Sequence, residues 1–213
     1  MSIIGTPTEW ADLIDSLVPD ILHLVIASWR HMPPPAPDDR EDDITTALCR
    51  TLRQNRTARS LPFQINTQHV ELDPMPGEDV GRLDIVFVPT IPREDYYFCL
   101  EAKRLNVVKD RQRRAYASEY VLFGMMRFVT GKYSQTVRHG GMIGYVLDGN
   151  VSDAISNVAA NIQQNQEKLC MEPPGAFQPS AILTQESGAR ETDHQRSQET
   201  RKFRIHHLFV PVQ

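Results

Sequence analysis

The sequence has little cysteine, and what it has is scattered. Its three cysteines, Cys49, Cys99 and Cys170, form no C-x-x-C pair, which argues against a disulfide scaffold and predicts reduced thiols. The first residues lack the basic segment and the A-x-A-like cleavage site of a secretory signal peptide. These absences predict a cytoplasmic protein.

Long apolar runs are missing as well. The longest, residues 21–29, contains His23 and is much shorter than the roughly 20 residues that span a bilayer, so we expect no membrane partner. The signatures G-x-S-x-G, H-E-x-x-H and G-x-G-x-x-G are also absent. The usual motifs of serine hydrolases, zinc proteases and dinucleotide-binding proteins are therefore not found.

What the chain does have is the composition of a globular domain. Of its 213 residues, 40% are hydrophobic and 23% are charged, which is enough apolar material for a core. The formal net charge is −4, so the overall field does not attract a polyanion. Any contact with nucleic acid must therefore come from a local basic patch.

Hydrophobic periodicity and turn residues divide the chain into helices and strands. We expect helices over about residues 9–18 (capped by Thr8), 19–32, 39–56 (capped by Asp38 or Asp39), 109–130 and 152–169. We expect strands over about residues 63–72, 82–89, 96–105, 142–147 and 203–212, and a mobile polar loop over 186–202. This order predicts an α/β or α+β fold, a central mixed sheet with helices on both faces.

Prolines mark a division near the start of the chain. Pro19 starts or kinks the second helix, and the run MPPPAP over residues 32–37 predicts a stiff connector. We therefore expect a helical extension with a proline linker over residues 1–37 and the main domain over residues 38–213. The helices of the extension are apolar enough either to pack on a partner subunit or to cover the sheet.

Charged residues interrupt the two strongest strands. Within residues 96–105, Glu101 and Lys103 share one face of a strand whose two faces are largely apolar. Asp84 is the lone acid of the apolar strand 82–89. A short loop joins the strands, so an antiparallel hairpin could place Asp84 beside Glu101. Because buried charges are costly unless they are paired or bind a metal, these positions predict a functional site.

Glu41 supplies a third acid. It precedes Ile44 by three residues and Leu48 by seven, a spacing that puts it on the apolar stripe of its helix. Asp42 and Asp43 should instead face water. An acid on the buried stripe needs a partner, and a metal site would be one. The alternative is a solvated acid at the start of a helix.

These residues resemble the PD-(D/E)XK phosphodiesterase superfamily, which includes restriction endonucleases, repair nucleases and effectors of prokaryotic anti-phage systems. Glu41 on an early helix, Asp84 on a strand and Glu101-Ala102-Lys103 on the next strand match its pattern, although no proline precedes Asp84. The resemblance implies a restriction-endonuclease-like fold. It also implies that Asp84, Glu101, Glu41 and the Ala102 carbonyl hold a metal ion, and that Lys103 orients or activates water. We expect Mg²⁺, with Mn²⁺ as a substitute, because a hard cation can neutralise a phosphodiester and activate water.

Basic residues follow the proposed site. Residues 103–114 carry six cations and one acid, and Arg50, Arg53, Arg56 and Arg59 recur every third residue. Both stretches could track a phosphate backbone, and a solvated surface is the alternative for each. The nucleic-acid-binding candidates are Arg50, Arg53, Arg104, Lys109, Arg111, Arg113 and Arg114, with Arg127, Lys132 and Arg138 as further basic residues.

The sequence thus predicts a magnesium-dependent nuclease that hydrolyses phosphodiester bonds. The superfamily favours DNA over RNA as the substrate. Since no separate domain for reading sequence is evident, we expect a homo-oligomer or a subunit of a larger defence or repair assembly. The alternatives are a catalytically inactive nuclease-fold subunit that serves DNA binding or complex assembly, and a merely structural surface pair of Glu101 and Lys103.

Overall fold

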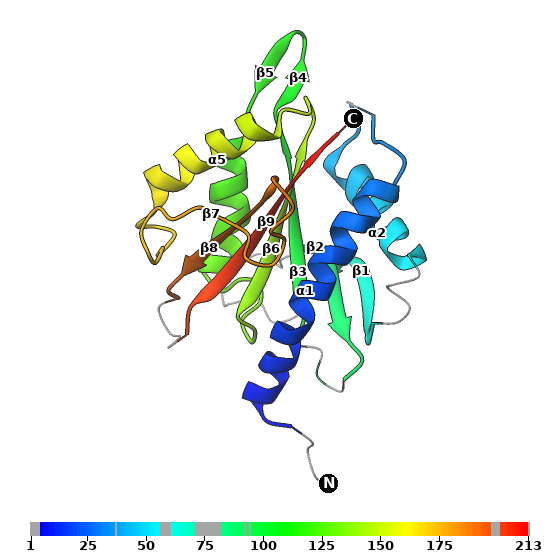
Figure 1. Ribbon diagram of the computed structural model, residues 1–213, viewed down its shortest axis with the longest axis vertical. Coiled ribbons are helices and arrows are strands. Elements are labelled where there is room, and N and C mark those ends of the chain that lie inside the picture. Colours follow the sequence, from blue (N-terminus) through cyan, green and yellow to red (C-terminus); the bar gives the residue numbers. More distant parts are fainter. Residues whose placement is uncertain are drawn as a thin grey trace.

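The computed structural model describes residues 5–36, 38–55, 61–70, 82–91, 93, 95–196 and 201–212. Within these residues the chain forms one large mixed sheet with helices on both faces (Figure 1). Its seven strands lie in the order β1 (Phe63–Val70), β2 (Arg82–Pro89), β3 (Phe98–Leu105), β6 (His139–Val146), β9 (Phe203–Pro211), β8 (Ala189–His194) and β7 (Gln178–Pro179). The expected mixed α and β class is therefore confirmed.

The sheet changes direction at β3. β1, β2 and β3 run antiparallel, whereas β3 pairs in parallel with β6, and β6 with β9. The predicted hairpin of β2 and β3 is confirmed, with Ile85 opposite Leu100 and Phe87 opposite Phe98. β3 is thus a central strand with a partner on each side, which explains why both of its faces are apolar.

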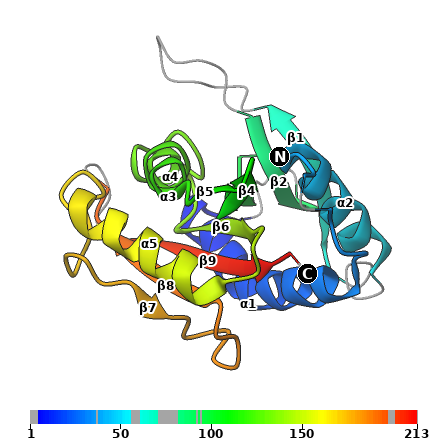
Figure 2. The same cartoon turned by 90° about the horizontal axis from the view of Figure 1, so that it is seen from above.

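A hydrophobic core lies on each face of the sheet (Figure 2). The first core is covered by α1 (Pro7–His31) and α2 (Glu41–Gln54). The second is covered by α3 (Ala117–Glu119), the π-helix η2 (Tyr120–Met125), α4 (Met126–Val129) and α5 (Val151–Asn165). β3 contributes to both, since Phe98 and Leu100 lie in the first core and Cys99 in the second.

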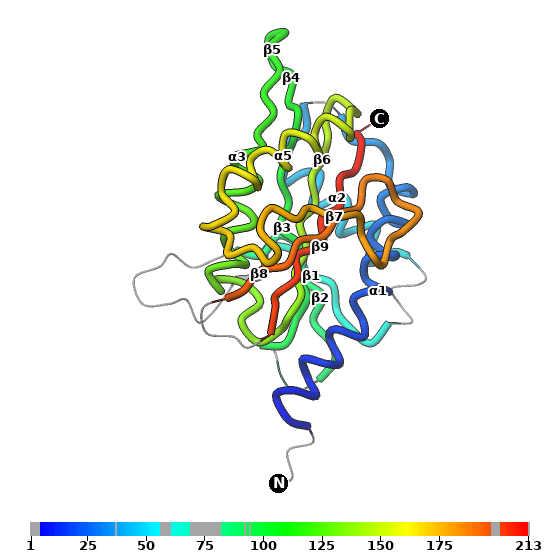
Figure 3. The backbone as a smooth tube through the Cα atoms, turned by 60° about the vertical axis from the view of Figure 1, so that its left-hand side comes forward, coloured from blue at the N-terminus to red at the C-terminus, as the bar shows by residue number. Residues whose placement is uncertain are grey.

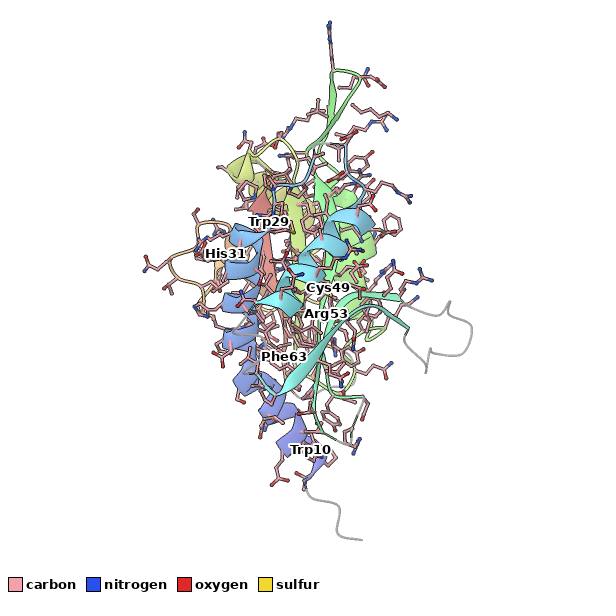
Figure 4. All side chains as sticks on the ribbon, turned by 90° about the vertical axis from the view of Figure 1, so that its right-hand side faces the viewer. Trp10, Trp29, His31, Cys49, Arg53 and Phe63 are labelled. Atoms are coloured by element: carbon pink, nitrogen blue, oxygen red, sulfur yellow. The ribbon has the colours of Figure 1, made fainter. Side chains whose placement is uncertain are left out.

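α1 is one helix where the sequence predicted two. A capping box at Thr6, not Thr8, begins it, and it continues through Pro19. The ring of Trp29 stacks on Tyr145 of β6 with centroids 5.4 Å apart (Figure 4). Of the two alternatives for these helices, the structure therefore shows the one in which they cover the sheet. Among the described helices, none combines the length and the apolar character that crossing a bilayer requires.

The predicted helix over residues 109–130 is wrong in its first part. A small hairpin of β4 (Val107–Lys109) and β5 (Gln112–Arg114) occupies the start of that range, and the helical segment begins only at Ala117. β-branched Val107 and Val108 favour a strand. Asp110 and Arg111, both with positive φ, form the tight turn between the two strands.

The predicted loop over residues 186–202 is wrong for residues 189–194, which form β8, and residues 197–200 lie outside the described residues. This strand buries polar side chains that bond to one another. Thr192 Oγ1 lies 2.7 Å from His194 Nε2 and 2.9 Å from His207 Nε2. Since buried polar groups are tolerated when they have hydrogen-bond partners, a strand can form here without an apolar pattern.

Candidate active site

Adjacent strands bring Asp84 and Glu101 together. The ladder between β2 and β3 pairs Ile85 with Leu100, so one further step along both strands sets Asp84 opposite Glu101. Asp84 does not continue the ladder. Its Oδ2 accepts a hydrogen bond of 2.7 Å from the backbone N–H of Ala102. The carboxylate is thereby fixed to the segment that carries Glu101.

Glu101 is the most buried charge of the site, with a side chain only 1% exposed. Its Oε1 accepts two hydrogen bonds of 2.7 Å, one from Lys103 Nζ and one from Arg127 Nη1. Its Oε2 is buried and has no hydrogen-bond partner among the described residues. An unpaired buried carboxylate oxygen carries the full cost of desolvation, and coordination of a cation is one interaction that would offset that cost.

Glu41 reaches the same site from α2. It is the first residue of that helix, and the N-cap is Arg40 rather than Asp38 or Asp39. Glu41 Oε2 accepts a 2.9 Å hydrogen bond from the backbone N–H of Arg104, and Oε1 lies 3.3 Å from Lys103 Nζ. The side chain is 30% exposed, so Glu41 forms the solvent side of the site.

The Lys103 ammonium holds the site together. Besides Glu101 and Glu41, it donates a 2.6 Å hydrogen bond to the carbonyl oxygen of Ala102. Three donors thus meet three acceptors, which is the full capacity of a lysine. Two of the three segments predicted from the sequence, those of Glu41 and Glu101, therefore meet at this ammonium, and the third, that of Asp84, is bonded to the backbone of Ala102 beside it.

Arg127 and Tyr133 belong to the site in a way that the sequence did not indicate. Arg127 Nη1 also donates to Tyr133 Oη at 2.8 Å, and Tyr133 in turn donates to the carbonyl of Arg82 at 2.9 Å. Arg127 was a candidate only as one more basic residue. The sequence feature that comes closest to indicating this part of the site is Gly124, since a Cβ there would lie 2.4 Å from Met142 Cε. That close approach lets the helical segment lie directly over the sheet.

Burial and like charge set the protonation of the acids. Burial, followed by the charge of Glu101, raises the pKa of Asp84 to about 7, against the opposing hydrogen bond from Ala102. Burial also raises the pKa of Glu101, although Lys103 and Arg127 oppose it. Burial lowers the pKa of Lys103, but Glu101 and Glu41 more than offset that effect, so its pKa is raised. Lys103 is therefore a cation at neutral pH.

The donor set suits a hard divalent cation. Asp84, Glu101 and the Ala102 carbonyl offer oxygen atoms only, and the unpartnered Glu101 Oε2 is one of them. Within the described ranges, no three His, Cys, Asp or Glu side chains form a ready metal cage. Mg²⁺ seldom requires such a cage, because it binds one or two carboxylates and completes its shell with water and substrate phosphates.

The basic candidates fall into two groups. Three of them serve the fold. Arg53 binds the Ile65 carbonyl and Asn66 of β1 (Figure 4), Arg104 binds the Asp39 carbonyl, and Arg113 pairs with Asp148 and Asp153. The second group consists of Arg50, Lys109, Arg111 and Arg114, which are exposed and form no ion pair with a described residue. Arg56 and Arg59 lie outside the described residues.

Comparison of the chain with protein-family models, with curated proteins and with solved structures gave no match.

Proposed function

We propose that this chain is a magnesium-dependent nuclease that hydrolyses phosphodiester bonds of DNA, within a fold of the restriction-endonuclease type. One observation carries the proposal. Glu101 Oε2 is buried without a hydrogen-bond partner in the described part of the chain, next to a second, half-buried carboxylate, Asp84. Carboxylates whose pKa values are strongly perturbed inside a protein are typical of functional sites.

The charges of the site support a divalent cation. Three carboxylates, those of Asp84, Glu101 and Glu41, surround two cations, Lys103 and Arg127. With all groups ionised the site has one negative charge in excess, which would repel a phosphodiester. A divalent ion reverses that sign, so the anionic substrate and the acids can occupy the same place.

Asp84, Glu101, Glu41 and the Ala102 carbonyl would hold Mg²⁺, with Mn²⁺ as a substitute, and the ion would draw charge from the phosphoryl group and make water more acidic. Lys103, 15% exposed and directed between Glu101 and Glu41, is placed to donate to a phosphoryl oxygen or to orient the attacking water. Arg127 keeps the Glu101 carboxylate in place from the opposite side.

A second function is favoured by a different observation. Lys103 already uses its donors on Glu101, Glu41 and Ala102, which is the arrangement of a structural ion pair, and such pairs also perturb pKa values. The chain would then be an inactive nuclease-fold subunit that binds DNA or assembles a complex. For either function a homo-oligomer or a partner subunit is part of the proposal.

The test is cleavage of plasmid and single-stranded DNA by the purified protein in Mg²⁺, Mn²⁺ or EDTA. We expect cleavage that requires the metal and that falls by about a hundredfold or more in Glu101→Gln and Lys103→Ala. Asp42→Asn is the matched control, because Asp42 lies one residue from Glu41 and faces solvent. Binding of DNA without cleavage in any metal would instead support the inactive subunit.

A further inference from the structure

The β4–β5 hairpin projects from the sheet at the end of β3 (Figures 1 and 3). Every side chain from residue 107 to residue 114 is exposed or half-buried, and apolar Val108 is 56% exposed. Only Val107, at the base, packs against a hydrophobic core, and a two-stranded ribbon with so little packing is marginal by itself. Such a ribbon needs an anchor at its base and, for its exposed apolar side chain, a partner.

The anchor is an ion-pair network at the base of the hairpin. Arg113 Nε lies 2.8 Å from Asp148 Oδ2, and Arg113 also pairs with Asp153 of α5. Asn106 donates to Asp148 Oδ1 at 3.0 Å, and its backbone N–H donates to the carbonyl of Ala115. These contacts fix the base of the hairpin to α5 and to Asp148. The charge of Arg113 is therefore engaged in ion pairs within the protein.

The remaining cations lie on the other face and at the tip. Val108 pairs with Arg113 across the hairpin, so these two share the face turned toward α5. Lys109 and Arg114 lie on the opposite face, and Arg111 lies in the turn. None of these three cations forms an ion pair with a described residue, whereas Arg113 forms two. The unpaired charge of the hairpin thus lies at its tip and on the face that it shares with Val107, opposite to the Arg113 face.

The turn itself favours a role for the Arg111 side chain. Asp110 and Arg111 have φ of 52° and 61°, the left-handed region that Asn and Gly adopt far more readily in two-residue turns. Arginine is not among the residues that favour this turn conformation. Strained backbone that persists at one position is a pointer to function, and here it puts a guanidinium at the outermost point of the hairpin.

We propose that the β4–β5 hairpin enters the major groove of duplex DNA and that the substrate is therefore double-stranded. A two-stranded ribbon, with strands about 5 Å apart, fits a groove about 12 Å wide and about 8.5 Å deep. Three residues per strand and the turn reach about that depth. Lys109 and Arg114 would meet phosphates, and Arg111 would meet base edges.

The other nucleic acids fit less well. The major groove of an RNA duplex is too narrow for side chains to read. Proteins that bind single strands stack bases on aromatic side chains, and residues 107–114 contain no aromatic residue. Duplex DNA is therefore the nucleic acid whose geometry matches a basic two-stranded ribbon without aromatic side chains.

The inference rests on the proposed function and extends it to a substrate class. Six residues separate Lys103 from Lys109, at most about 20 Å of extended chain. One turn of duplex is about 34 Å long. A duplex whose groove holds the hairpin therefore presents a phosphodiester to the carboxylates within the same turn.

The experiment measures binding of the full chain in EDTA, where metal-dependent cleavage cannot interfere. Fluorescence anisotropy follows a labelled DNA duplex of about 24 base pairs, roughly two turns, the matching single strand and the matching RNA duplex, over a range of salt concentrations. We expect the wild type to prefer the DNA duplex. Lys109→Ala/Arg111→Ala/Arg114→Ala should bind it about tenfold or more weakly and lower the slope of log K against log salt by about 2 to 3.

Two further variants separate the hairpin from overall charge. Lys168→Ala/Arg201→Ala/Lys202→Ala removes the same charge, and Arg201 and Lys202 precede β9 at the end of the molecule opposite the hairpin (Figure 1). This control should bind nearly as the wild type does. Asp110→Asn/Arg111→Gly suits the turn better and leaves the net charge unchanged. It should fold at least as stably and still lose affinity for the duplex.

The outcomes distinguish this inference from the proposed function. Equal binding of single strand and duplex, no duplex binding at all, or wild-type affinity in the triple hairpin variant would overturn the hairpin proposal, even for a protein that cleaves DNA. Hairpin-dependent duplex binding without cleavage in any metal would support the hairpin and overturn the nuclease.

Discussion

Asp84 Oδ2 accepts a 2.7 Å hydrogen bond from the backbone N–H of Ala102, the residue between Glu101 and Lys103. One carboxylate is thus tied to the peptide that positions another carboxylate and an ammonium. Asp84 cannot move away from Glu101 without breaking this contact between β2 and β3. The site is therefore preorganised, and the repulsion between Asp84 and Glu101 is built into the folded state.

The first prediction concerns the pH dependence of stability. The pKa of Asp84 is about 7 in the folded protein against an ordinary value of 3.8. Between these values the Asp84 carboxyl loses its proton in the unfolded chain but keeps it in the folded protein, so the contribution of Asp84 to the free energy of unfolding falls as pH rises from about 4 to about 7 and then levels off. The loss from Asp84 amounts to at most about 4 kcal/mol.

Asp84→Asn should remove this loss, because the amide does not ionise. Urea unfolding at pH 5 and pH 8, without divalent ions, compares the two proteins. The gain in stability of the variant over the wild type should be larger at pH 8 than at pH 5, by up to about 3 kcal/mol. An equal difference at both pH values would contradict the assigned pKa.

The second prediction concerns metal binding. Mg²⁺ at about five times its dissociation constant should raise the free energy of unfolding of the wild type by about 1 kcal/mol. Glu101→Gln should lose that response, since it replaces the unpartnered Oε2 and removes a charge. Thermal unfolding with and without Mg²⁺ measures the effect, and Asp42→Asn should respond as the wild type does. An undiminished Mg²⁺ response in Glu101→Gln would place the ion elsewhere.

The third prediction separates the two oxygens of Glu41. Glu41→Gln retains an acceptor for the Arg104 N–H but loses the ion pair with Lys103, so it should fold normally and bind Mg²⁺ more weakly. Glu41→Ala loses both contacts and should also lose about 1 kcal/mol of stability. Isothermal calorimetry and urea unfolding distinguish these outcomes. Equal stability of the two variants would show that the Arg104 contact contributes little.

The fourth prediction concerns Arg127 as a positioning residue. Its guanidinium opposes the rise in the pKa of Glu101, so Arg127→Ala should raise that pKa further. Cleavage should fall by about tenfold at neutral pH and recover at higher pH, with the activity profile displaced by about one unit. Arg127→Lys should recover part of the loss, and Lys132→Ala should leave the profile in place. A loss of the same proportion at every pH would mean that Arg127 only supports the fold.

The core of the site could be predicted because its signals are local. Asp84 and Glu101 are charges inside apolar strands, and a short connection between two strands favours an antiparallel pair. The same pattern yielded the face on which Glu101 and Lys103 lie. Their convergence with Glu41 depends on how α2 crosses the sheet. The apolar stripe of the helix predicted that Glu41 faces the sheet, but not which strands it meets.

The rest depended on contacts between distant parts of the chain. The β4–β5 hairpin was predicted as helix because Lys, Arg and Gln are good helix formers, and the turn at Asp110 and Arg111 has neither Gly nor Asn to mark it. β8 was predicted as loop because its stability comes from polar side chains such as Thr192 meeting His207 of a neighbouring strand. Arg127 and Glu101 are 26 residues apart, a pairing that no periodicity encodes.

The order of the strands along the chain differs from their order in the sheet. β9 comes last among the described strands, yet it lies between β6 and β8. During synthesis the ribosome must therefore release residues 203–211 before the two parts of the sheet can join. A chain interrupted before Phe203 would leave open edges on β6 and β8, and open edges recruit other chains. Premature termination should thus yield aggregates rather than a smaller folded protein.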